Sequence, residues 1–316
     1  MGEKKALRAR AAAVLAVLSV ACIGVALVPT VDAQEALPER PTVLPWTPPA
    51  WHPAPQALQV LPEMDAPGQE TVSGINARAS FLFDLDEGRV LHAESADNLR
   101  PVASLTKLTT GLTWASEGRG LDDTYCVDAR FYPTRSGAYS KLSTGECYRG
   151  YDLLGAAMVS SDNRGAYGVQ VASGLDWDAF NQRMHQVSAD LGMVSSSWAE
   201  PSGLDDENLS TARDMAKAAV AVSAHPTLSI AASAPSWWLE QADGSPNRLL
   251  YSTDRLVGRG DLQVLAGKTG YTDTAGYCFV GVVELDSGRR VVVSVLGASS
   301  SSKRWSDVNK LLRSVK

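Results

Sequence analysis

The sequence predicts an α+β fold, in which helices cover an antiparallel β-sheet. Three observations lead to this prediction: a strand hairpin near residue 80, a second hairpin near residue 285, and helical patterns between and after them. Strands from both ends of one chain bury their apolar faces most simply by joining a single sheet. The middle of the chain then supplies helices to cover that sheet.

Each predicted hairpin consists of two strand-like runs on either side of a turn. Residues 79–85 and 90–93 flank an Asp-Glu-Gly turn, and residues 277–285 and 290–296 flank an Asp-Ser-Gly turn. Asp, Ser and Gly favour tight turns, because their side chains bond the local backbone or leave it free to bend. We therefore expect one hairpin to open the domain and the other to close it.

Helical periodicity marks three further segments. Asp176 is a good N-cap, and apolar residues recur behind it at helical spacing. The apolar positions of this helix are Trp177, Phe180, Met184, Val187 and Leu191. Residues 211–223 and 305–312 follow similar patterns, which predicts two more helices.

The N-terminal 33 residues resemble a targeting segment. Four basic residues precede an apolar run at 11–28, and small residues follow at Val31 and Ala33. The run of 18 residues is slightly shorter than the roughly 20 that a membrane-spanning helix needs. We predict a signal peptide at 1–33 that is cleaved after Ala33; the alternative is an uncleaved N-terminal anchor. Both interpretations export the rest of the chain.

The next segment, 34–72, contains nine prolines, a composition typical of an extended linker. Residues 73–316 remain, and they are numerous enough to form one domain with a single large core.

Charge and histidine content argue against two classes of function. The formal net charge is -6 and no basic patch with interleaved aromatic residues occurs, so we expect no nucleic acid partner. The four histidines are scattered and no cysteine pair has zinc-ligand spacing, so we expect no metal.

Export bears on the cysteines, because oxidising compartments preserve disulfides. Cys22 would leave with the signal peptide. Cys126 and Cys147 bracket a stretch rich in Gly, Ser and Tyr, where a local disulfide and two free thiols are both open interpretations. Cys278 lies in an apolar run, so we expect it to be unpaired and buried.

The segment Ser104-Leu105-Thr106-Lys107 places a hydroxyl and an amine three residues apart. Pro101 upstream favours a helix start here, and this spacing puts both side chains on one face of a helix. A serine becomes nucleophilic when a neighbouring base takes its proton, and a lysine serves as that base when burial or another cation lowers its pKa. Alone, the pattern also fits an exposed N-cap beside a solvated lysine.

A second segment, Ser161-Asp162-Asn163, follows an apolar helical stretch at 153–159. A hydroxyl and an amide held between two helices can relay a proton and bond a substrate amide. Polar residues at an ordinary helix end would give the same pattern.

The third segment, Gly267-Lys268-Thr269-Gly270, precedes Tyr271 and the closing strands. Lys268 offers a positive charge that can bind a carboxylate and lower the pKa of Lys107. Gly270 allows a substrate backbone to approach the strand closely.

The three segments occur in the order that is the signature of class A β-lactamases and penicillin-binding proteins. More closely, the chain resembles the D-alanyl-D-alanine carboxypeptidases, the low-molecular-weight penicillin-binding proteins, over about residues 77–296. The stretches that carry this resemblance are 100–107, 201–204, 209–216, 248–250 and 267–272.

The resemblance implies a β-lactamase-like fold, in which an all-helical part packs on an α/β part built round the antiparallel sheet. It also implies roles for the motif residues. Ser104 would attack the D-Ala-D-Ala amide, Lys107 would take its proton, and Ser161 would pass a proton to the departing D-alanine.

The remaining site residues would bind the substrate. Asn163 would hold its amide, and Lys268 and Thr269 would bind its terminal carboxylate. The backbone N–H groups of Ser104 and Tyr271 would form the oxyanion hole.

The implied protein is a serine hydrolase without metal or cofactor, with its catalytic domain at 73–316. It would act outside the cytoplasmic membrane on peptidoglycan stem peptides that end in D-Ala-D-Ala, and β-lactams would inhibit it covalently. The chain ends soon after the predicted closing helix, so we expect neither the family's C-terminal β domain nor its membrane-binding tail. Membrane attachment would then require an uncleaved N-terminus.

Two positions depart from the family pattern. Glu200 stands where many members carry Asn before the Pro-x-Gly-Leu stretch, and Asp162 stands where Gly is frequent. A transpeptidase or endopeptidase on the same fold is one alternative, and a β-lactamase is another, although Glu200 lacks the E-x-x-L-N setting of class A. A catalytically inactive cell-wall binding module is the non-enzymatic alternative, and the intact motifs count against it.

Overall fold

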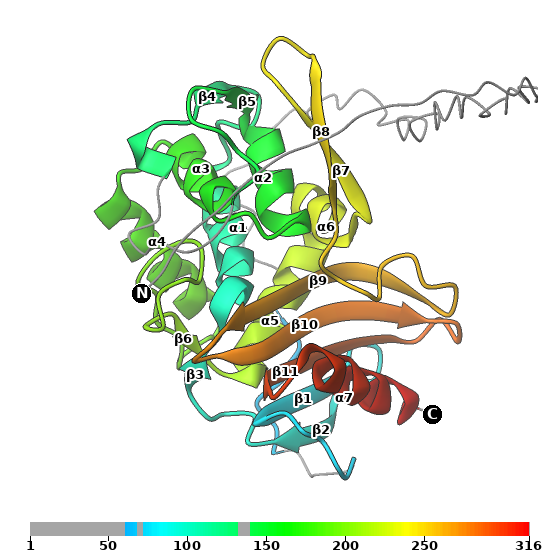
Figure 1. The fold of residues 1–316 in the computed structure, drawn as a ribbon. Coiled ribbons are helices and arrows are strands. Elements are labelled where there is room, and N and C mark those ends of the chain that lie inside the picture. Colours follow the sequence, from blue (N-terminus) through cyan, green and yellow to red (C-terminus); the bar gives the residue numbers. More distant parts are fainter. Residues whose placement is uncertain (1–60, 68–71, 132–139, 316) are drawn as a thin grey trace, which may run out of the picture. The chain divides into compact units, whose positions relative to one another are not determined.

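The fold is built on a five-stranded antiparallel sheet (Figure 1). The computed structural model describes residues 61–67, 72–131 and 140–315, so the predicted signal peptide or anchor and most of the linker lie outside the described residues. The strands of the sheet are β1 (Ala79–Asp84), β2 (Arg89–Glu94), β9 (Leu262–Thr272), β10 (Gly276–Leu285) and β11 (Arg290–Ala298). They follow the order β2-β1-β11-β10-β9 across the sheet.

Strands from the two ends of the domain meet in this sheet. β1 pairs with β11 in antiparallel register, with Ala79 opposite Leu296. β1 also pairs with β2, and β10 pairs with β11, each through the turn that the sequence predicts. Both predicted hairpins are therefore confirmed.

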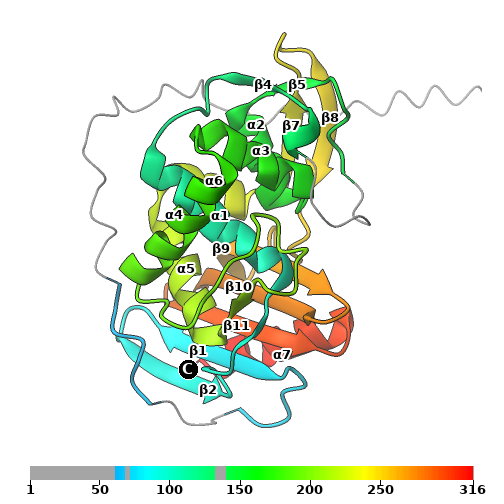
Figure 2. The same ribbon diagram turned by 90° about the vertical axis from the view of Figure 1, so that its left-hand side faces the viewer.

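Helices cover both faces of the sheet (Figures 1 and 2). α5 (Ala212–Ala224) packs on one face and α7 (Ser301–Arg313) packs on the other. Successive strand residues point to opposite faces, so Phe81 and Phe83 join the α5 side of the core while Leu82 joins the α7 side. Because both faces are covered, every residue of β1 is buried.

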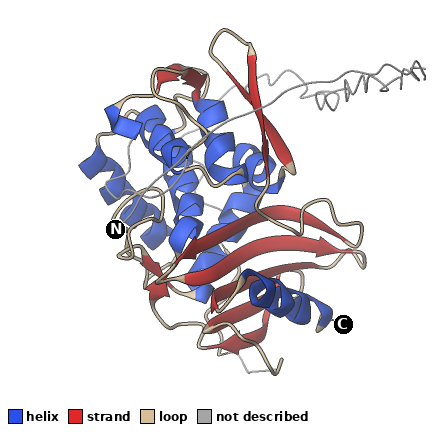
Figure 3. Ribbon diagram, viewed as in Figure 1, coloured by secondary structure: helices blue, strands red, loops and turns tan. Residues whose placement is uncertain are grey.

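A second, mainly helical part adjoins the sheet (Figure 3). Its helices are α1 (Thr106–Glu117), α2 (Gly150–Val159), α3 (Asn163–Ser173), α4 (Trp177–Asp190) and α6 (Pro226–Ser233). Three short strand pairs accompany them: β3 (Arg100–Pro101) with β6 (Leu209–Ser210), β4 (Thr124–Cys126) with β5 (Cys147–Arg149), and β7 (Ser236–Glu240) with β8 (Pro246–Tyr251). The α+β fold class is confirmed.

The three helices predicted from periodicity are also confirmed. α4 begins after Asp176, whose carboxylate accepts a hydrogen bond from the Ala179 N–H at 2.9 Å. α5 coincides with the predicted segment 211–223. α7 begins at Ser301, earlier than its apolar pattern indicates, because the Ser300 hydroxyl caps it.

The cysteines adopt two states. Cys126 and Cys147 form a disulfide between the paired strands β4 and β5, where they lie directly opposite each other. Cys278 is a buried free thiol on β10.

Residues 61–67, which belong to the predicted linker, lie against α5. Met64 is fully buried in the core, and its carbonyl accepts a hydrogen bond from Arg213. Asp65 forms an ion pair with Lys217 at 2.8 Å. The last part of the proline-rich segment therefore packs on the domain. No helix within the described ranges is long and apolar enough to cross a membrane.

Candidate active site

Ser104 lies in a 3-10 turn, η1 (Ala103–Leu105), that leads into α1. The sequence predicts a helix start at this serine, but the α-helix begins two residues later, at Thr106. Ser104 instead belongs to the 3-10 turn, and Ala103 before it has a φ of 50°, a left-handed conformation outside the α-helical range. A non-glycine residue held there costs on the order of 1–3 kcal/mol, which the surrounding packing must supply.

Lys107 is fully buried on the first turn of α1, and its amine reaches Ser104 as predicted. Nζ lies 2.9 Å from Ser104 Oγ, 2.7 Å from Asn163 Oδ1 and 2.5 Å from the carbonyl oxygen of Ser202. Burial lowers the pKa of Lys107 to about 8, although the nearby carboxylates of Glu200 and Asp162 raise it. An amine with this pKa is partly neutral near physiological pH, as a general base must be.

Ser161 and Lys268 form a second serine and lysine pair. Lys268 Nζ donates a hydrogen bond to Ser161 Oγ at 2.9 Å and to the carbonyl of Thr269 at 3.1 Å. Ser161 lies between α2 and α3 with a φ of 59°, another left-handed non-glycine conformation. The chain therefore turns sharply here and presents the hydroxyl to β9.

The positive charges of the two lysines repel each other. Burial, followed by the positive charge of Lys107, lowers the pKa of Lys268 well below its ordinary value. Burial is also the largest cause of the lowered pKa of Lys107. Because repulsion between two positive charges is mutual, the expectation that Lys268 lowers the pKa of Lys107 stays a prediction.

Asp162, one of the two departures from the family pattern, organises the start of α3. Its carboxylate caps the helix by accepting a hydrogen bond from the Gly165 N–H at 3.1 Å. The same carboxylate accepts from the Ser140 hydroxyl at 2.8 Å and from the Lys141 N–H at 2.5 Å. It therefore holds Asn163, the first residue of α3, at Lys107 and secures a neighbouring loop as well.

The third motif lies in the middle of β9, directly beside η1. A Cβ atom at Gly270 would lie 2.8 Å from the Val102 carbonyl oxygen and 3.2 Å from the Ser104 backbone nitrogen. Only glycine allows the strand to approach the serine this closely. The Thr269 hydroxyl is hydrogen-bonded to that of Thr253 at 2.6 Å.

Tyr271 lies at the outer end of this motif. Its side chain is about half exposed and packs against Tyr277, with ring centroids 4.3 Å apart. Its hydroxyl donates a hydrogen bond to Asp273 at 2.7 Å. The structure thus brings all the predicted site residues to the junction of η1, α1, α3 and β9.

Sequence reasoning missed a buried carboxylate behind Lys268. Asp254 lies so close to Gly267 that a Cβ atom there would be 2.2 Å from Asp254 Oδ2. Burial raises the pKa of Asp254 to about 6, while the charges of Lys268 and Arg304 lower it. A single aspartate in a loop belongs to no recognisable motif, so the sequence does not identify Asp254. The one available signal is Gly267, since a glycine before Lys268 allows a buried group to approach the strand closely.

Glu200 is the second missed residue, since the sequence identified it only as a departure from the family pattern. Its buried carboxylate accepts hydrogen bonds from the N–H and hydroxyl of Ser202, at 2.7 and 2.5 Å. The Ser202 carbonyl is the group that contacts Lys107. A backbone carbonyl leaves no trace in the sequence, so this contact could not be predicted.

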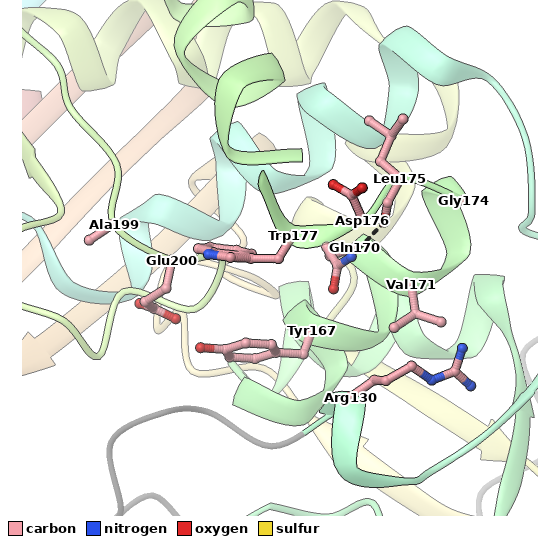
Figure 4. Close-up of a pocket in the computed structure, with 10 residues that line it drawn as sticks. All are labelled: Arg130, Tyr167, Gln170, Val171, Gly174, Leu175, Asp176, Trp177, Ala199 and Glu200. Atoms are coloured by element: carbon pink, nitrogen blue, oxygen red, sulfur yellow. Dashed lines mark hydrogen bonds between the residues drawn. The ribbon is translucent and has the colours of Figure 1, made fainter. Parts of the chain in front are cut away.

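A cavity of about 540 Å³ is lined in part by Glu200 (Figure 4). Tyr167 and Trp177 face each other across it with ring centroids 6.5 Å apart, and Glu200 closes one end. None of the predicted catalytic residues lines this cavity. Across the described ranges, no group of His, Cys, Asp and Glu is arranged to hold a metal ion.

Comparison with known proteins agrees with this geometry. The sequence pattern of the D-alanyl-D-alanine carboxypeptidase family matches residues 66–300. A D-alanyl-D-alanine endopeptidase from Escherichia coli is 27% identical over 258 residues, which cover 82% of each chain.

Two solved structures are similar to the chain as well. A D-alanyl-D-alanine carboxypeptidase from Mycobacterium tuberculosis has a TM-score of 0.68 at 25% identity, covering 79% of this chain and 95% of its own. A penicillin-binding protein from Listeria monocytogenes, in its cefotaxime-bound form, has a TM-score of 0.65 at 29% identity, covering 76% of this chain and 97% of its own.

Proposed function

The chain belongs to the D-alanyl-D-alanine carboxypeptidase family, and we propose that it removes the terminal D-alanine from peptidoglycan stem peptides through an acyl-serine intermediate. The main support for this proposal is that two buried lysines each contact a serine. Lys107 Nζ lies 2.9 Å from Ser104 Oγ, and Lys268 Nζ lies 2.9 Å from Ser161 Oγ. A serine hydrolase needs one such pair to activate its nucleophile and another group to protonate its leaving amine.

In the first step, Ser104 Oγ attacks the carbonyl carbon of the penultimate D-alanine, and Lys107 takes the hydroxyl proton. The buried position of Lys107 and its pKa of about 8 support this role, because a neutral amine can accept the proton. The backbone N–H groups of Ser104 and Tyr271 would stabilise the oxyanion, and the close approach at Gly270 supports this pairing.

In the second step, the C–N bond breaks and the departing D-alanine nitrogen receives a proton. We assign that transfer to Ser161, and the hydrogen bond that Lys268 donates to its oxygen supports the assignment. Water then attacks the acyl ester, which releases the shortened peptide and regenerates the Ser104 hydroxyl.

Substrate binding would use the remaining motif residues. Asn163 would bond the substrate amide through its side-chain nitrogen, since its Oδ1 accepts from Lys107. Lys268 and Thr269 would bind the terminal carboxylate, whose negative charge offsets the repulsion between the two lysines.

We further propose that the protein acts outside the cytoplasmic membrane. Peptidoglycan lies there, and residues 1–33 have the composition of a signal peptide or an anchor. We assign residues 34–72 to a linker whose last part packs on the catalytic domain, and residues 73–316 to that domain. β-Lactams would acylate Ser104 as substrate mimics, and the cefotaxime-bound relative supports this expectation.

Release of D-alanine tests the proposal. Purified protein is incubated with a diacyl-Lys-D-Ala-D-Ala peptide, and free D-alanine is measured beside a Ser104→Ala variant. We expect release by the wild-type protein and none by the variant. A wild-type protein that releases no D-alanine, while a known carboxypeptidase does so in parallel, contradicts the proposal.

An endopeptidase is the second candidate, and the name of the Escherichia coli relative favours it. Such an enzyme cuts the amide that a D-alanine makes within a cross-linked peptide, through the same acyl-serine. Incubation with a cross-linked peptide dimer separates the two activities, because only an endopeptidase converts the dimer to monomers.

A further inference from the structure

The carboxylate of Glu200 is buried and surrounded by hydrogen-bond donors. Oε2 accepts from the Ser202 N–H and hydroxyl at 2.7 and 2.5 Å, and Oε1 accepts from the Leu204 N–H and from Asn208 Nδ2, both at 2.7 Å. Oε1 also accepts from the N–H of Gly203. The backbone at 202–204 thus folds around the Glu200 carboxylate, and these hydrogen bonds hold the conformation of that backbone turn.

This turn is held against the nucleophile on two sides. Gly203 has a φ of 84°, and a Cβ atom there would lie 2.0 Å from the Ala103 carbonyl oxygen, so the turn contacts η1 directly. On the other side, the Thr110 hydroxyl of α1 donates a hydrogen bond to the Pro201 carbonyl at 2.7 Å. The Ser202 carbonyl between these contacts therefore points at Lys107.

The Ser202 carbonyl restricts the direction of the Lys107 lone pair. A neutral amine carries two hydrogens and one lone pair. Asn163 Oδ1 and the Ser202 carbonyl oxygen can only accept, so they take the two N–H groups. The lone pair is then left facing Ser104 Oγ, which is where a general base needs it.

We propose that Glu200 is a positioning residue of this site, which aims the lone pair of Lys107 at Ser104 by holding the Ser202 carbonyl in place. The inference rests on the proposed function, because it concerns how the general base of that reaction is oriented. The hydrogen bonds of the Glu200 carboxylate go to the turn and to Asn208, not to Ser104, so Glu200 acts through the turn.

The charge of Glu200 provides an independent signature of this role. Three charged groups face Lys107: Glu200 from the turn, Asp162 from the start of α3, and Lys268 from β9. The negative charge of Glu200 raises the pKa of Lys107 against the larger effect of burial. Removing that charge lowers the pKa of Lys107 and shifts the acidic limb of the rate profile to lower pH. A residue that merely stabilised the fold would not shift it.

The test compares Glu200→Gln with Asp307→Asn in the full chain. Asp307 of α7, on the far face of the sheet, is a matched control. It is equally buried, and its carboxylate accepts hydrogen bonds from two backbone N–H groups, at 2.9 and 2.8 Å. The rate of covalent labelling by a fluorescent penicillin is measured between about pH 5 and pH 10.

We expect Glu200→Gln to label more slowly at its plateau, by on the order of tenfold to a hundredfold, with its acidic limb at lower pH. Asp307→Asn should keep the wild-type plateau and limb. If the wild-type protein is labelled and Glu200→Gln shows the same plateau rate and the same acidic limb, this inference is overturned but the proposed function is not. A wild-type protein that takes no label contradicts the proposed function and this inference with it.

Glu200→Asp covers the case in which the glutamine variant does not fold. It keeps the charge but is one methylene shorter, so it no longer reaches every donor of the turn. We expect a slower plateau with the acidic limb unmoved. A wild-type plateau in this variant overturns the inference.

Discussion

Lys268 Nζ lies 2.9 Å from Ser161 Oγ, although 107 residues separate the two in the chain. The contact joins β9 to the turn between α2 and α3, and so connects the sheet to the helical part. The pair of Ser104 and Lys107 is local by comparison, since both lie at the start of α1. The long-range pair depends on the fold, and the local pair contains the proposed nucleophile.

The pH dependence of kcat/KM should follow Lys107. The amine accepts a proton only when neutral, and its neutral fraction rises as pH passes its pKa of about 8. We expect kcat/KM for D-alanine release to rise about tenfold per pH unit below that value and to level off above it. A rate that is constant between about pH 6 and pH 8 contradicts the role of Lys107 as base.

Two substitutions of Ser161 separate its hydroxyl from its strained backbone. Ser161→Ala removes the hydroxyl and keeps the cost of the left-handed φ of 59°, whereas Ser161→Gly removes both. We expect both variants to lose on the order of a hundredfold in kcat for D-alanine release, because neither relays a proton. Near-normal activity in the glycine variant would show that the backbone, not the hydroxyl, is what matters.

The approach of β9 to η1 requires Gly270. In Gly270→Ala the new Cβ would lie 2.8 Å from the Val102 carbonyl, so strand and turn must separate. We expect acylation by penicillin to slow by on the order of a hundredfold while the protein stays folded. Gly260→Ala is the matched control, since its Cβ meets nothing within 4 Å. Equal rates in the two variants would refute the importance of this contact.

The disulfide should stabilise the helical part. Cys126 and Cys147 are 21 residues apart, and a closed loop of this size is worth about 3 kcal/mol in the unfolded-chain model. We expect the double variant Cys126→Ser/Cys147→Ser to melt roughly 6–12 °C below the oxidised wild-type protein. Reductant should lower the Tm of the wild-type protein and leave that of the variant unchanged. Identical melting of all samples would contradict this.

The sequence predicts the parts of the fold that depend on local patterns. Both hairpins follow from turn residues between strand-like runs, and α4 follows from its N-cap at Asp176 and its apolar spacing. The 3-10 turn before α1 was not predicted, since Ala103 in that turn has a positive φ and contacts Gly203 and β9, which are distant in the chain.

In the candidate site, too, the features that depend on local spacing could be predicted and those that depend on distant contacts could not. The reach of Lys107 to Ser104 follows from their spacing, but the Ser202 carbonyl and the carboxylate of Glu200 behind it do not. A glutamate two residues before a serine has many roles, and only the fold buries this one behind Lys107, the proposed general base. The lowered pKa values of Lys107 and Lys268 likewise depend chiefly on burial, which the sequence does not specify.

Mass spectrometry of the protein after reaction with benzylpenicillin examines the nucleophile itself. We expect a single covalent adduct, located on the peptide that contains Ser104, and no adduct in the Ser104→Ala variant. An adduct on any other residue, or one that persists in the variant, would mean that Ser104 is not the nucleophile.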